Sequence, residues 1–175
     1  MAKKELITEA RNVISGASRN LDEKILFKAT ELKPRVVSLA SRLSEILGYV
    51  DSILGGVEQR IGEETKSNIL SLGSWFYVTF YKDSFSIVRN KPYTIVISYR
   101  KGEGRVYIRT RKFKATISPR IIELSQMAMK VEIDLTSPRD FENKLSEIRY
   151  LLRPLGKIIE HQLLPVAEKR LGIVV

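Results

Sequence analysis

The sequence contains no cysteine and only one histidine, His161. The absence of cysteine excludes disulfides, thiolate catalysis, iron–sulfur clusters and cysteine-containing zinc sites. One histidine leaves almost nothing from which to build a transition-metal site or a serine-type catalytic triad. We therefore expect a protein that is not an enzyme and that carries no metal and no cofactor.

Long apolar runs are also missing, and those present are far too short to span a bilayer. The chain starts Met-Ala-Lys-Lys-Glu-Leu, without the apolar core of a signal peptide, so we expect an intracellular, cytoplasmic protein. Glutamine occurs three times and asparagine five times, whereas charged residues make up 29% of the chain. That balance is found in proteins of thermophiles.

The positive charge of the chain is concentrated in one segment. The formal net charge is +10, and residues 82–120 hold eleven basic against two acidic side chains, so nine of the ten excess charges lie there. The basic residues of this segment are Lys82, Arg89, Lys91, Arg100, Lys101, Arg105, Arg109, Arg111, Lys112, Lys114 and Arg120. Such segregation favours a polyanionic partner, with nucleic acid first and an anionic membrane surface second.

Two long helices are predicted at the start of the chain. Apolar residues recur at helical spacing through residues 2–33, and Pro34 marks the start of a second helix. The second helix has apolar a and d positions of a heptad and a further apolar row at every seventh residue. The a and d positions are Val36, Leu39, Leu43, Ile46, Val50, Ile53 and Val57, and the further row is Ala40, Leu47, Leu54 and Ile61. Three rows are more than a two-stranded seam needs, which indicates a bundle or a helix that also covers a sheet.

We therefore predict that residues 1–72 form a coiled-coil-like helical hairpin that assembles a homo-oligomer, a dimer or a tetramer. Gly55-Gly56 is expected to mark a hinge or the end of the second helix, because glycine is a poor helix former.

After Gly73 the apolar period changes to two, and β-branched and aromatic residues become frequent. We predict strands over residues 74–81, 84–89, 93–100, 105–111, 113–117 and 128–135. Ser118-Pro119 and Ser137-Pro138 each predict a helix start, with serine as the N-cap and proline in the first turn. Pro154 and Pro165 should kink the closing helix.

The predicted fold class is α+β, with an N-terminal helical hairpin, an antiparallel sheet of five or six strands and a C-terminal kinked helix. Residues 73–175 would form the sheet and the C-terminal helix, and would carry the basic binding face. Met127 and Met129 are predicted to fill the core.

Pairing the strands about their turns predicts which residues share a face. A hairpin closed around Gly102-Glu103 places Ser98 opposite Tyr107 and Val96 opposite Arg109, with the core on the other face. A bulge or break between Arg111 and Phe113 would return the following lysines to the same face. The predicted nucleic-acid-binding residues are Trp75, Tyr77, Tyr81, Arg100, Lys101, Arg105, Tyr107, Arg109, Arg111, Lys112 and Lys114.

Exposed aromatic rings among arginines are typical of a surface that binds single-stranded nucleic acid, because rings stack on unpaired bases and guanidinium groups neutralise phosphates. The sequence does not distinguish DNA from RNA. One alternative is that the long helices cover the aromatic side chains. Others are a virion-type or complex-assembly scaffold whose helices bind a partner, and a protein of the membrane surface.

A basic antiparallel sheet with Trp75, Tyr77, Tyr107 and Arg109, joined to a zipper-like helix, resembles the archaeal ThermoDBP-type single-stranded-DNA-binding proteins and their relatives. The resemblance is one of architecture over most of the chain. It implies binding of single-stranded DNA and an oligomerising helix, and it assigns no individual binding residue.

Overall fold

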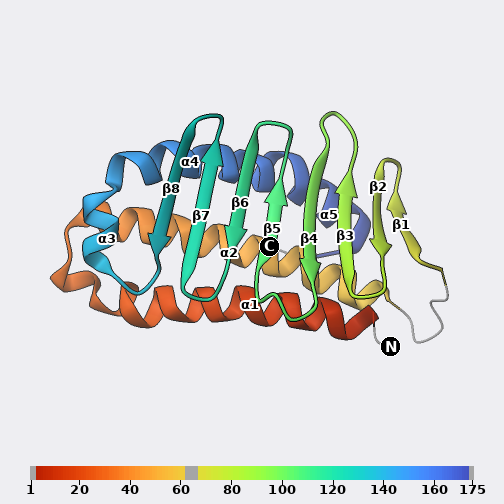
Figure 1. The fold of residues 1–175 in the computed structure, drawn as a ribbon, viewed down its shortest axis with the longest axis horizontal. Coiled ribbons are helices and arrows are strands. Elements are labelled where there is room, and N and C mark those ends of the chain that lie inside the picture. The colour runs from red at the N-terminus through yellow and green to blue at the C-terminus, as the bar shows by residue number, and fades with distance from the viewer. Residues whose placement is uncertain (1–2, 62–66, 174–175) are drawn as a thin grey trace.

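Two long helices open the chain, α1 (Lys3–Lys24) and α2 (Pro34–Arg60), joined by the short 3-10 helix η1 (Leu26–Glu31). The computed structural model, which describes residues 3–61 and 67–173, places them side by side as a hairpin (Figure 1). Pro34 is the first residue of α2, where its fixed φ suits the first turn. The predicted helical hairpin is confirmed.

The sheet is an antiparallel meander in which every strand pairs only with its neighbours along the chain. It has eight strands, not the five or six expected. The strands are β1 (Ile69–Gly73), β2 (Phe76–Phe80), β3 (Ser84–Arg89), β4 (Ile95–Arg100), β5 (Val106–Arg109), β6 (Phe113–Ile117), β7 (Ile121–Gln126) and β8 (Met129–Asp134).

The prediction of a helix start at Ser118-Pro119 is wrong, because these residues form the turn between β6 and β7. The hydroxyl of Ser118 donates to the carbonyl of Ile121 at 2.8 Å and accepts from the Ile121 amide at 3.3 Å. A serine hydroxyl bonds to nearby backbone in a turn as readily as at a helix start. Strand β7 was missed for this reason, and β1 because its partly exposed edge shows little alternation.

All the long helices pack on one face of the sheet, where they lie across the strands (Figure 1). Alternate strand residues such as Val78, Ile97 and Ile108 are buried against them. One hydrophobic cluster contains residues of the helical hairpin, the sheet and the C-terminal helices. The core is therefore the layer between the helices and the sheet.

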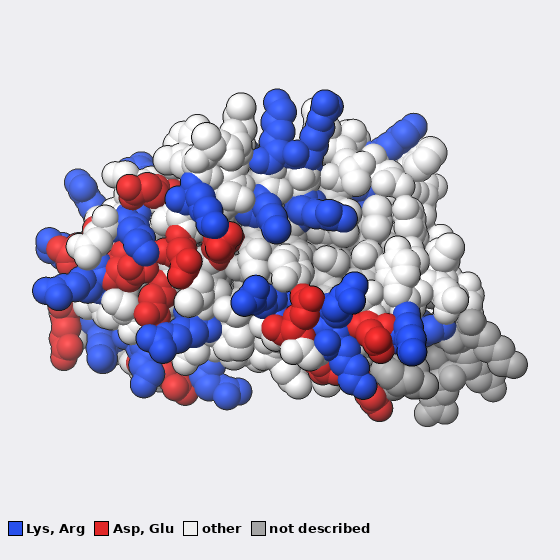
Figure 2. Space-filling model, in the orientation of Figure 1, with Lys and Arg blue, Asp and Glu red and all other residues white. Residues whose placement is uncertain are grey.

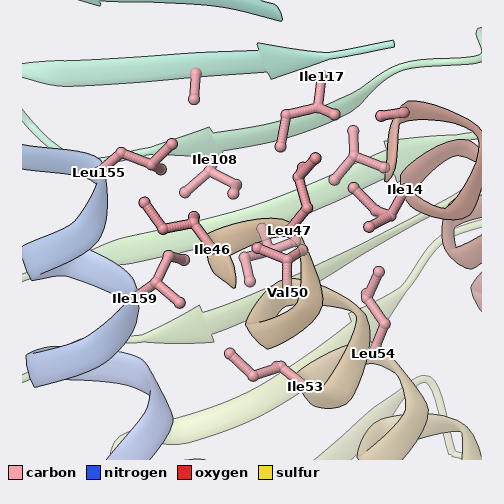
Figure 3. Packing of buried hydrophobic residues seen from close by; sticks show 14 of the residues in the cluster. Ile14, Ile46, Leu47, Val50, Ile53, Leu54, Ile108, Ile117, Leu155 and Ile159 are labelled. Carbon is pink, nitrogen blue, oxygen red and sulfur yellow. The ribbon is translucent and has the colours of Figure 1, made fainter. Parts of the chain in front are cut away.

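Helix α2 lies in the middle of the helical layer, between α1 and the C-terminal helices (Figure 1). Ile46 lies toward Ile108, Leu155 and Ile159, whereas Leu47 lies on the side of Ile117 and Ile14 (Figure 3). Every residue of its three apolar rows except Leu39 is buried within the chain. The rows that suggested a contact between subunits are thus used inside the molecule, and the homo-oligomer loses the observation that motivated it.

Gly55-Gly56 neither bends nor ends α2, which continues to Arg60. Gly56 is buried against Leu171 and Ile173 near the C-terminus, and a Cβ atom on it would approach Ile173 Cγ2 to 2.8 Å. The glycine allows the C-terminal segment to pack close to α2.

The C-terminal part is a broken helix, as predicted. It comprises α3 (Pro138–Asn143), α4 (Leu145–Lys157), the π-helical segment η2 (Ile158–Leu163) and α5 (Leu164–Leu171). Ser137 caps α3 by accepting from the Asp140 amide at 3.1 Å. Pro154 lies inside α4, and Pro165 lies in the first turn of α5. None of the helices described is long and apolar enough to cross a membrane.

Candidate nucleic-acid interface

The face of the sheet opposite the helices, here the open face, carries the outward residues of the strands (Figures 1 and 2). On β2, Tyr77 and Thr79 point outward between the buried Phe76, Val78 and Phe80. Tyr107 on β5 is likewise half-buried and lies on this face. The helices therefore cover the other face, and the alternative in which they cover these tyrosines is wrong.

The predicted pairing of β4 and β5 is confirmed, with Ser98 opposite Tyr107 and Val96 opposite Arg109. Arg109 is in turn opposite Lys114 on β6, so two cationic side chains are adjacent on the open face. The bulge or break predicted between Arg111 and Phe113 is a break: β5 ends at Arg109, and β6 begins at Phe113 after a tight hairpin turn. The Thr110 amide closes this turn by donating to the Phe113 carbonyl at 2.8 Å.

Side chains between Tyr77 and Tyr107 on the open face are small. The pairings across β3 and β4 place Ser86 beside Ser98 and Val88 beside Val96. Tyr77 and Tyr107 lie three strands apart, which corresponds to about 14 Å between their strands. The small side chains of β3 and β4 separate the two tyrosine rings, which would therefore contact different bases.

A hollow of about 280 Å³ lies beside Tyr107. Its lining includes the side chains of Ser84, Ser86, Ser98, Arg100, Glu103 and Tyr107. The Tyr107 hydroxyl donates to Glu103 Oε2 at 3.2 Å, and Lys114 Nζ lies over the ring, 5.6 Å from its centroid. Arg100 Nε lies 3.8 Å from Glu103 Oε1, so one cation of the hollow is partly neutralised. The hollow offers an aromatic wall and serine hydroxyls to a base.

Exposed aromatic side chains mark the two rims of the sheet. The upper rim is formed by the turns β1–β2, β3–β4, β5–β6 and β7–β8, and the lower rim by the turns β2–β3, β4–β5 and β6–β7 (Figure 1). Trp75 lies in the β1–β2 turn with 54% of its surface exposed, and Tyr81 follows β2 at the lower rim with 59% exposed. Trp75 is thus not part of the predicted strand over residues 74–81.

Trp75 and Met127 are the two described non-glycine residues with positive φ, at 61° and 55°. This left-handed region is costly for bulky residues and favours glycine. Met127 lies in the β7–β8 turn and is 83% exposed, and Met129 is also exposed, so the prediction that they fill the core is wrong. Lys91, which sequence reasoning did not select, lies over the Trp75 ring, with Nζ 4.3 Å from its centroid. No sequence signal marks this contact, because it depends on the turn geometry.

Charge divides the open face into zones (Figure 2). Strands β4 to β6 carry Arg100, Arg109 and Lys114, whereas β7 and β8 place Glu123 opposite Glu132. Acidic and basic side chains are intermingled at the β7–β8 end of the face, where Lys130 Nζ lies 3.3 Å from Glu123 Oε1, whereas basic side chains predominate over the middle strands and the upper rim (Figure 2). Phosphates would therefore be attracted most strongly to β4–β6.

The structure distributes the eleven predicted binding residues over three places. The open face holds Tyr77, Arg100, Tyr107, Arg109 and Lys114; the upper rim holds Trp75, Arg111 and Lys112; the lower rim holds Tyr81, Lys101 and Arg105. Among the described residues, no acidic side chain forms an ion pair with Arg105, Arg109 or Lys114. These cations remain available to an anionic ligand.

The described part of the chain contains no group of three or more side chains that could hold a metal ion. Comparison with known proteins gives no match to a family model, to a curated protein or to a solved structure.

Proposed function

We propose that the protein binds single-stranded nucleic acid, DNA or RNA, without catalysis and with tolerance of sequence. The observation that carries the proposal is the arrangement around Tyr107. Its ring stands on an uncovered sheet face beside a hollow lined by serines, and Arg109 and Lys114 lie opposite each other on the neighbouring row. An aromatic ring beside unpaired cations can stack on a base while the cations contact phosphates.

The contacts available on the open face explain the expected tolerance of sequence. Stacking on Tyr107 or Tyr77 uses the π-face that every base has, and contacts of Arg109 and Lys114 with phosphates carry no sequence information. The cations of β4–β6 and of the adjoining rims would hold the strand over this part of the face. Unpaired bases are required, because bases stacked within a duplex do not expose their faces.

The scaffold alternative relied on the apolar rows of α2, which are buried inside the chain. A homo-oligomer, a cytoplasmic location, a thermophilic source and the resemblance to ThermoDBP-type proteins stay predictions. An anionic membrane surface is the competing partner for the same cations, and the experiment below includes it.

Fluorescence anisotropy with labelled single-stranded DNA, single-stranded RNA and duplex DNA tests the proposal. If four to six cations contact phosphates, the slope of log K against log salt is about −3 to −4 for a single strand. Vesicles containing anionic lipid serve as the competitor. Equal affinity for duplex and single strand, an affinity unchanged over a tenfold rise in salt, or a clear preference for vesicles would contradict it.

A further inference from the structure

A hollow lies at the upper rim, where the turns of three hairpins meet the C-terminal helix. It has a volume of about 650 Å³, within the range of small-molecule sites. Tyr93, Arg111, Lys112 and Gln126 come from the turns and strand ends, and Lys157 and Gln162 come from α4 and η2. We call it the rim pocket.

The side chains of the rim pocket combine three chemical classes. Phe113, Pro92, Pro154 and Ile158 supply apolar surface, and Tyr93 adds a second aromatic ring. Arg111, Lys112 and Lys157 supply positive charge, and no aspartate or glutamate is among the described lining residues. The amides of Asn90, Gln126 and Gln162 can both donate and accept hydrogen bonds.

The backbone on the helical side of the rim pocket departs from α-helical geometry. The Leu164 amide donates to the carbonyl of Ile159, five residues earlier, as in a π-helix. Ile158 and Gln162 of this segment both line the pocket. Single π-helical turns inside α-helices are frequently found at functional sites.

We infer that the rim pocket binds one nucleotide. The apolar and aromatic surface suits the faces of a base, the amides suit its polar edge, and the three cations suit a phosphate. An uncharged aromatic ligand would leave the cations unused, and a simple phosphate would leave the apolar surface unused.

Two sources could supply this nucleotide, a free nucleoside monophosphate or the terminal nucleotide of a bound strand. Arg111 and Lys112 lie in the turn that joins Arg109 to Lys114, so the pocket adjoins the basic part of the open face. A strand lying on β5 and β6 could therefore place its end in the pocket. Only this second source rests on the proposed function.

Isothermal titration calorimetry with AMP tests the site. The test variants are Lys157→Ala, which removes a cation, and Gln162→Glu, which adds a carboxylate of the same size. Lys169→Ala is the control, because Lys169 is an exposed lysine of α5 outside the pocket. We expect AMP to bind more tightly than adenosine, each test variant to weaken AMP about tenfold or more, and the control to change little.

The inference is overturned if about 1 mM AMP gives no binding to the wild type, or if Lys157→Ala and Lys169→Ala bind AMP equally. Oligonucleotides with a 5′-phosphate, a 3′-phosphate or neither then identify the source. If Lys157→Ala weakens AMP and also weakens a terminally phosphorylated strand more than the unphosphorylated one, the source is the strand end. If it weakens AMP and leaves all three strands unchanged, the source is the free nucleotide. Loss of strand binding in Arg109→Ala tests the open face separately, so the two failures are distinguishable.

Discussion

The hydroxyl of Tyr99 on β4 donates a 2.8 Å hydrogen bond to Glu9 Oε1 on α1. The same oxygen accepts from the Gly102 amide at 3.4 Å, in the turn between β4 and β5. Tyr99 is a core residue, and burial, followed by the bond to Glu9, raises its pKa to about 12. This contact fixes the hairpin that carries Lys101 and Arg105 to the first helix.

The raised pKa of Tyr99 predicts a pH-dependent stability. An unfolded tyrosine ionises near pH 10, whereas the folded one stays neutral to about pH 12, so its contribution is complete below pH 10 and is lost as pH rises through this interval. Tyr99→Phe should lower the free energy of unfolding by about 1 to 2 kcal/mol at pH 7. In urea unfolding, the difference between the two proteins should shrink above pH 10. A constant difference from pH 7 to pH 12 would contradict the prediction.

Tyr107→Ala should weaken binding of a single-stranded oligonucleotide by about 1 to 3 kcal/mol, because it removes a stacking ring. The salt slope should change little, since the lost contact is uncharged. Tyr150→Ala, which removes an exposed tyrosine of α4, is the control and should leave the affinity unchanged. If Tyr107→Ala instead lost about 3 to 5 kcal/mol of folding stability, the ring would belong to the core.

Arg109→Ala should weaken binding and also reduce the salt slope by about 0.7, the value for one phosphate contact on a single strand. Arg35→Ala, on the first turn of α2, provides a matched loss of one exposed arginine. Anisotropy titrations at several salt concentrations measure both quantities. An identical slope in the two variants would exclude Arg109 from the phosphate contacts.

Trp75→Gly should separate stability from binding. Glycine adopts the positive φ of this turn without strain, so the free energy of unfolding should stay the same or rise by up to about 1 kcal/mol. Affinity for a single strand should fall by about 1 to 3 kcal/mol, because an exposed ring is lost. Met127→Gly relieves the same backbone strain in the β7–β8 turn and should leave the affinity unchanged. A loss of stability in Trp75→Gly would show that the tryptophan is retained for folding.

Ile53→Ala tests whether the apolar rows of α2 serve the fold of a single chain. Ile53 is fully buried, so the variant should lose about 2 to 5 kcal/mol of unfolding free energy. The thermal midpoint should not vary over a tenfold range of protein concentration, because the contacts are within one chain. A thermal midpoint that rises with protein concentration would indicate that Ile53 lies at an interface between subunits.

The sequence predicts the register around Gly102-Glu103 well, because a short turn and strict alternation leave one pairing that buries one face. The sequence predicts that α2 is a helix but not which elements pack against it, because three apolar rows could contact a second subunit as well as a sheet. Ser118-Pro119 is compatible with a helix start and with a hairpin turn. The turn forms because Ile122 and Leu124 of β7 are buried in the core and pair with residues of β6.

The candidate site was predictable where it depends on alternation along a strand, as for Tyr107 and Arg109. It was not predictable where it depends on turns. The contact of Lys91 with Trp75 and the convergence of Arg111 with Lys157 in the rim pocket join segments that only the folded chain brings together.

The length of the helices that cross the meander matches the width of the sheet. Helix α2 has 27 residues, about 40 Å, and the seven gaps between eight strands span about 34 Å. Because strands pair only with chain neighbours, one hairpin could be inserted or deleted without altering the other pairings. It would change the sheet width by about 10 Å, which corresponds to some six or seven helical residues. Homologues with more or fewer strands should therefore show compensating changes in the length of α2, two helical turns for each hairpin.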